Sequence, residues 1–185
     1  MKQRAALVLT AMVFAVMAAA QTPPAPPKPG PEVKKLGYFA GTWKLEGEMK
    51  PGPMGPGGKF TETDHMQWMD GGFFLVSHAE AKLPTGQSKS TAIFGYDANE
   101  KAYTYQEYNS MGETIHARGA VAGDTWTWTN EEKMEGKMMK GRYTVKVTSP
   151  TSYTFKFEMQ PEGAAWATVM EGTATKQTAA APAKK

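Results

Sequence analysis

The chain has 185 residues, which is the length of a single domain. It contains no cysteine, so disulfide bonds and cysteine chemistry are excluded. The net charge of +3 falls to +1 once Lys2 and Arg4 are set aside with the first twenty residues, and a near-neutral remainder gives no electrostatic case for a nucleic-acid partner.

The first twenty residues have the pattern of a secretory signal peptide. Lys2 and Arg4 form a basic start, an uncharged and mostly apolar stretch follows to Met17, and residues 18–20 are all alanine, as at a cleavage site. The apolar stretch is shorter than the roughly 20 residues that a membrane-spanning helix needs. We therefore expect an exported protein, periplasmic or extracellular, with no transmembrane segment after cleavage.

Composition divides the rest of the chain into a linker, one domain and a tail. Residues 21–31 include six prolines and are expected to form an extended linker. Residues 177–185 are mostly Ala and Lys and are expected to be disordered. The folded domain is predicted to span residues 32–176.

Alternation of apolar and polar residues dominates this domain and predicts β-strands. It is clearest from Ser152 to Met159, where every second residue is Tyr, Phe or Met. Turn residues separate the runs. The pattern predicts a short helix at 32–40 and ten strands near 42–49, 59–68, 72–82, 87–96, 101–108, 113–121, 124–130, 140–148, 152–159 and 165–175.

Ten short strands in sequential hairpins favour an all-β, antiparallel up-and-down barrel, because closure removes exposed sheet edges. A barrel of this size has room for one small ligand or for side chains that fill it. The fold therefore gives the capacity to bind a ligand inside the barrel. The alternative is a filled barrel that acts as an interaction or structural protein through its loops.

The entry into the predicted barrel has a recognisable pattern. Leu36-Gly37-Tyr38-Phe39-Ala40-Gly41-Thr42-Trp43 resembles the start of a calycin barrel, in which a short helix leads into a strand with Gly-x-Trp. Gly41 would let the backbone approach closely, and Trp43 would close the barrel floor with a large ring.

Further segments extend this resemblance over about residues 36–176. They are Phe94-Gly95-Tyr96-Asp97, Asn109-Ser110-Met111-Gly112, Asp124-Thr125-Trp126-Thr127-Trp128, Gly141-Arg142-Tyr143 and Val169-Met170-Glu171-Gly172. In this order they resemble a bacterial family of secreted domains of unknown function, numbered 1579, which is lipocalin-like in fold. The resemblance implies a fold but no activity.

No cofactor or metal is expected. Nitrobindin, a related barrel, binds haem through a His near its C-terminal end, but the last predicted strand here holds no His. His65, His78 and His116 fall on three different strands without the close spacing of zinc ligands, and His65 should face water. The methionines are expected to fill gaps and cap the mouth of the barrel rather than to hold Cu(I).

No catalytic residues are assigned. Ser77 and His78 are adjacent on one strand and point to opposite faces, so they cannot act as nucleophile and base together. Residues 50–58 are rich in Gly and Pro but lack a phosphate-loop ending, and are read as a hairpin loop or lid.

The second predicted strand carries the most unusual pattern. Glu62 and Asp64 share a face with Phe60 and Met66, so if the apolar pair points inward the two carboxylates do too. Buried carboxylates need partners or raised pKa values. The candidate partners are His116, Arg118 and Arg142. The alternatives are carboxylates that reach solvent at an edge, or an acid and base pair of a hydrolase.

From these residues we expect a barrel that binds a small, largely apolar or amphipathic molecule in its interior. Polar residues would orient the ligand and aromatic residues would line the remainder. The predicted ligand-binding residues are Glu62, Asp64, Tyr103, Tyr105, His116, Arg118, Trp126, Trp128 and Arg142, with Gly41 and Trp43 at the barrel floor.

Overall fold

The computed structural model describes residues 26–52, 54–134 and 136–178. The predicted signal peptide and most of the predicted C-terminal tail lie outside these residues. A short helix α1 (Pro31–Lys35) continues into a 3-10 turn η1 (Leu36–Tyr38). Proline is well suited to the first turn of a helix because its missing N–H has no partner there in any case.

Ten antiparallel strands follow, as the alternation predicts. They are β1 (Gly41–Met49), β2 (Gly58–Trp68), β3 (Leu75–Leu83), β4 (Gly86–Asp97), β5 (Ala102–Asn109), β6 (Thr114–Ala122), β7 (Thr125–Met134), β8 (Lys137–Ser149), β9 (Ser152–Pro161) and β10 (Ala167–Gln177).

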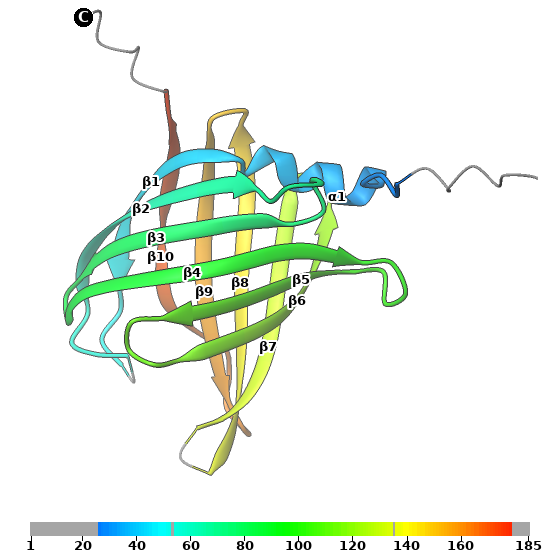
Figure 1. The fold of residues 1–185 in the computed structure, drawn as a ribbon. Helices are drawn as coiled ribbons and strands as arrows, with labels where there is room; N and C mark the ends of the chain where they lie inside the picture. The colour runs from blue at the N-terminus through cyan, green and yellow to red at the C-terminus, as the bar shows by residue number, and fades with distance from the viewer. Residues whose placement is uncertain (1–25, 53, 135, 179–185) are drawn as a thin grey trace, which may run out of the picture.

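The strands form a closed barrel in which each strand pairs with its neighbours in the sequence and β1 pairs with β10. The closing pair runs from Thr42 opposite Gln177 to Met49 opposite Met170. In Figure 1, β2–β6 cross in front of β7–β10, and α1 lies at one end of the barrel. The predicted all-β barrel with a short N-terminal helix is therefore confirmed.

One hairpin is longer than the sequence predicts. The sequence predicts one strand ending near residue 130 and the next beginning near residue 140, but β7 continues to Met134 and β8 begins at Lys137. The two strands stay paired at Glu131 opposite Lys140, and these side chains form a 3.1 Å ion pair. Cross-strand charge pairs support a ladder of polar residues, which apolar alternation does not detect.

Aromatic side chains close the end of the barrel next to α1 and η1. Trp43 is fully buried, and its indole N–H donates a 2.7 Å hydrogen bond to the carbonyl of Phe39. The ring of Phe39 packs against Trp126 at 5.2 Å, and Trp43 against Tyr153 at 4.8 Å. This cluster forms the floor of the barrel.

The opposite end carries the β1–β2, β3–β4, β5–β6, β7–β8 and β9–β10 connections. Some inward residues near this end are half-buried, among them Ser88, Asn109 and Met139, whereas Met49 and Met159 are buried. The two ends of the barrel therefore differ, with a packed floor and a mouth that is less tightly packed.

Candidate functional site

Strand pairing assigns the inner face of each strand without ambiguity. Trp43 and Leu45 are buried on β1 and lie opposite Asp64 and Glu62 of β2. Because paired residues point to the same side of a sheet, both carboxylates face the barrel interior. The expectation that Glu62 and Asp64 point inward with Phe60 agrees with this geometry.

A third carboxylate faces the same interior from β5. Glu107 lies opposite Ala92 of β4, and Tyr105 lies opposite Phe94. The hydroxyl of Tyr105 donates a hydrogen bond to Glu107. Sequence reasoning missed Glu107, although its place two residues after Tyr105 and four after Tyr103 puts it on the inner face.

Small side chains separate Glu107 from the other two carboxylates. The inner faces of β3 and β4 hold no large residue between these acids, because Asp64 lies opposite Ala79 and Glu62 opposite Ala81. In the next strand the pattern continues with Ser90, Ser88 and Ala92. This strip of small residues leaves room beside the carboxylates.

The wall across the barrel is aromatic. Tyr143 lies opposite Trp128 on one side and Phe157 on the other. Its ring stacks on Phe155 at 5.9 Å. The barrel interior is therefore bordered by carboxylates on one side and by aromatic rings on the other.

Several inward side chains retain exposure to solvent. Glu62, Tyr105, Glu107, Tyr143 and Phe157 are half-buried, although all of them point into a closed barrel. The middle of the interior is therefore less completely packed than the floor. A hollow of about 340 Å³ lies against the outer side of this wall. Most of its lining is outward-facing, and Glu62, Ala81 and Ser88 form the rest.

The environment shifts the acidity of all three carboxyl groups in the same direction. Burial, reinforced by Asp64 and Glu107, raises the pKa of Glu62 to about 7. Burial raises the pKa of Asp64 to about 6, although a 2.6 Å hydrogen bond from Ser77 opposes the change. Burial also raises the pKa of Glu107. These shifts reflect carboxylates without a cationic partner.

The predicted cationic partners do not reach this interior, and this expectation is wrong. His116 and Arg118 are exposed on the outer face of β6, and Arg118 forms a 2.7 Å ion pair with Glu100. The inner face of β6 is instead formed by Ile115, Ala117, Gly119 and Val121, and Trp128 of β7 occupies the space above Gly119.

Arg142 is also on the outer face. It pairs with Glu158 at 2.8 Å and lies over the ring of Trp166 at 4.2 Å. The reason is its position next to Tyr143, whose inward ring forces Arg142 outward.

The remaining predicted site residues lie on the inner face at two levels. Tyr103 and Trp126 are buried together in the floor, with ring centroids 4.8 Å apart, and Gly41 and Trp43 lie at the same end. Tyr105 and Trp128 lie further from the floor, two residues along the same strands. His65 is exposed and contacts Thr42 at 3.0 Å, so it faces water as expected.

Trp128 has an unusual polar group. Its side chain is only 6 % exposed, and its indole N–H has no hydrogen-bond partner among the described residues. Buried donors are nearly always paired, so an unpaired one indicates a missing acceptor. Trp128 lies beside Tyr143 on the aromatic wall.

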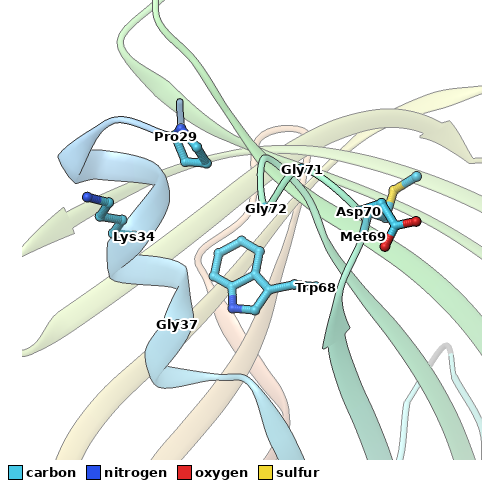
Figure 2. A pocket seen from close by; sticks show the side chains of 8 residues that line it. All are labelled: Pro29, Lys34, Gly37, Trp68, Met69, Asp70, Gly71 and Gly72. Atoms are coloured by element: carbon cyan, nitrogen blue, oxygen red, sulfur yellow. The ribbon is translucent and has the colours of Figure 1, made fainter. Parts of the chain in front are cut away.

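A second recess lies outside the barrel. Figure 2 shows it between α1–η1 and the β2–β3 turn, with the indole of Trp68 between them. It has a volume of about 550 Å³, and Lys34 and Asp70 are its charged residues. These two charged residues are the only ones in its lining, so the recess does not combine the groups that a catalytic or metal site needs.

The described parts of the chain contain no group of three His, Cys, Asp or Glu side chains placed to hold a metal ion. Nor does any described helix have the length and apolar character to span a membrane.

The comparison with known families decides where the chain belongs. Residues 28–176 match the family described as Protein of unknown function (DUF1579). The chain belongs to this family. No match to a curated protein was found.

Two solved structures are similar to this family member in fold. One is Rv2717c from M. tuberculosis, at 12% identity and a TM-score of 0.57, covering 82% of this chain and 100% of that one. The other is the S-type phycobiliprotein lyase CPES from Guillardia theta, at 9% identity and a TM-score of 0.53, covering 80% of this chain and 93% of that one. At these identities the likeness concerns the barrel fold alone.

Proposed function

We propose that this protein binds a small, largely apolar molecule inside its barrel, and that it does so outside the cytoplasm. The observation that carries the proposal is the half-buried inner face around Tyr105 and Tyr143 above a fully packed floor. The leader-like first twenty residues support export.

Binding would be passive enclosure. Removing apolar surface from water stabilises a complex by about 25 cal/mol per Å², and the half-buried Tyr143 and Phe157 offer such surface. Tyr105 and the inward carboxylates would orient the ligand through their polar groups. The floor residues Trp43 and Trp126 set the depth to which a ligand can enter.

The test is native mass spectrometry of the protein purified from its own host, with thermal shift in the presence of fatty acids, haem and aromatic compounds. We expect a co-purifying small mass and at least one ligand class that raises the melting temperature. Repeatedly empty preparations and no shift would overturn the proposal.

A matched pair of variants separates interior binding from a role of the outer surface. Ala81→Leu adds volume to the strip of small residues on the inner face, while Lys82→Leu changes the outer face of the same strand. We expect Ala81→Leu to abolish the melting shift and Lys82→Leu to retain it. If ligands bind equally to both variants, the site is not the barrel interior.

A further inference from the structure

The charge distribution inside the barrel indicates which ligands it accepts. Glu62 and Asp64 face the interior from β2, and Glu107 faces it from β5. On the described parts of β2–β9, the only Lys or Arg at an inner-face position is Lys137, which is exposed at the tip of the β7–β8 hairpin. The carboxylates in the middle of the interior therefore have no Lys or Arg beside them on these strands.

Basic residues near this wall are engaged elsewhere. Lys44 pairs with Glu46 at 2.8 Å and Lys89 with Glu80 at 2.6 Å, all on the outer face. Lys176, on the inner face of β10, lies at the floor, where its ammonium contacts the carbonyl of Tyr38 at 3.2 Å. None of these three lysines lowers the pKa of Glu62.

Two inner-face polar groups have no partner in the described protein. Glu62 receives no hydrogen bond, in contrast to Asp64 and Glu107. The buried indole N–H of Trp128 is also unpaired. They lie at different places: Tyr143 is within electrostatic reach of Glu62 and Asp64, whereas the indole nitrogen of Trp128 packs over Gly119 of β6.

The aromatic wall complements a cation as well as an apolar chain. The faces of Tyr, Trp and Phe rings attract organic ammonium groups within about 6 Å of the ring centre. A bare metal ion would instead require several oxygen or nitrogen ligands close together, and the described residues provide no such group.

We propose that the ligand of this barrel is an organic cation, an amine whose ammonium group is held by Glu62 and Asp64 and whose apolar part lies against Tyr143 and Phe157. This inference rests on the proposed function and adds the charge class of the ligand. Glu107 and the hydroxyl of Tyr105 complete the polar side of the site.

The test compares matched probes that differ only in the head group: octylamine, octan-1-ol and octanoate, and in parallel 2-phenylethylamine and 2-phenylethanol. Dissociation constants come from calorimetry and from tryptophan fluorescence of the full chain at pH 7.5. We expect each amine to bind at least tenfold more tightly than its alcohol, and octanoate to bind most weakly, because an anion would meet three carboxyl groups.

Variants assign the effect to the inner carboxylates. Glu62→Gln should weaken octylamine binding at least tenfold and leave octan-1-ol unchanged, whereas Glu46→Gln, on the outer face of β1, should change neither. Asp64→Asn provides a second inner-face variant if Glu62→Gln fails to fold.

The pH dependence gives an independent measurement. An ammonium group binds the ionised carboxylates, so octylamine affinity should rise from pH 5 to pH 8 while octan-1-ol affinity stays flat. The groups that titrate here are Glu62, Asp64 and Glu107, while His65 and His78 lie on the outer face and Tyr105, Tyr143 and Tyr153 stay protonated in this range.

The outcomes separate the two proposals. If the alcohols or octanoate bind as tightly as the amines, the barrel binds ligands but the inference about charge is wrong. If no probe of either series binds, both proposals fail. Amine affinity that is equal in Glu62→Gln, Asp64→Asn and Glu46→Gln would place the ammonium outside this site and overturn the inference.

Discussion

The hydroxyl of Ser77 donates a 2.6 Å hydrogen bond to Asp64 across the β2–β3 pair, and both side chains are buried. This bond is the largest influence that opposes the effect of burial on Asp64. It keeps Asp64 mostly ionised near neutral pH, whereas Glu62, with a pKa of about 7, has no comparable donor.

The first prediction concerns this bond. Ser77→Ala should raise the pKa of Asp64 above its present value of about 6, because the ionised form loses its donor. Carboxyl NMR titration measures it directly. Ser90→Ala, on the inner face of β4 opposite Ala79, is the control and should leave Asp64 unchanged. An unaltered titration in Ser77→Ala would show that water replaces the hydroxyl.

The second prediction is a pH dependence of stability. The folded-state pKa of Glu62, about 7, exceeds its ordinary value of 4.5, so the folded protein binds the proton more tightly than the unfolded chain. The free energy of unfolding should therefore fall as pH rises from about 4.5 to 7, and level off above that range as far as Glu62 contributes.

Glu62→Gln should remove this contribution. The variant is expected to be more stable than the parent protein at pH 8, by up to roughly 3 kcal/mol, and similar at pH 4. Urea unfolding followed by tryptophan fluorescence at several pH values measures the difference. Glu46→Gln should retain the slope of the parent, and an identical slope in Glu62→Gln would contradict the assignment.

The third prediction concerns the barrel floor. Trp43→Phe keeps most of the buried ring but loses the hydrogen bond to the carbonyl of Phe39, so it should cost about 1 kcal/mol of unfolding free energy. Trp43→Ala also opens a cavity and should cost about 3 to 5 kcal/mol. Denaturant unfolding distinguishes the two, and equal losses would mean that the ring volume is unimportant.

The fourth prediction tests the close packing of Gly119 against Trp128. A Cβ at Gly119 would lie 2.6 Å from the indole nitrogen and 2.7 Å from its neighbouring carbon, so Gly119→Ala must displace the ring. We expect a loss of about 1 to 3 kcal/mol and a changed near-ultraviolet circular dichroism spectrum. Gly30→Ala, where an added Cβ meets nothing within 4 Å, should change neither.

Alternation predicted the fold and part of the inner face, because a strand with one apolar face specifies which side chains are buried. Trp126 and Trp128 alternate with threonines, and Glu62 shares its face with Phe60, so these positions followed directly. The same alternation, continued from Tyr103 and Tyr105, also predicts that Glu107 points inward.

Strand β6 shows where the method fails. Its inner face carries Ile115, Ala117, Gly119 and Val121, two of them small, and its outer face carries His116 and Arg118, so its apolar alternation is weaker than that of β9. Small residues are required inside because Trp128 of the next strand extends over Gly119. That requirement depends on which residues pair across strands, and the sequence of β6 alone contains no information about it.

The pairing of β1 with β10 has a consequence for how the molecule is made. Gly41 to Met49 form the first strand to be synthesised, yet their final partners lie in the last strand of the barrel. Contacts so distant in sequence slow folding, and until they form the partial sheet presents two unpaired edges. A chain cut short before Ala167 would keep those edges permanently, which makes premature termination near the C-terminus a route to aggregation rather than to a shorter working barrel.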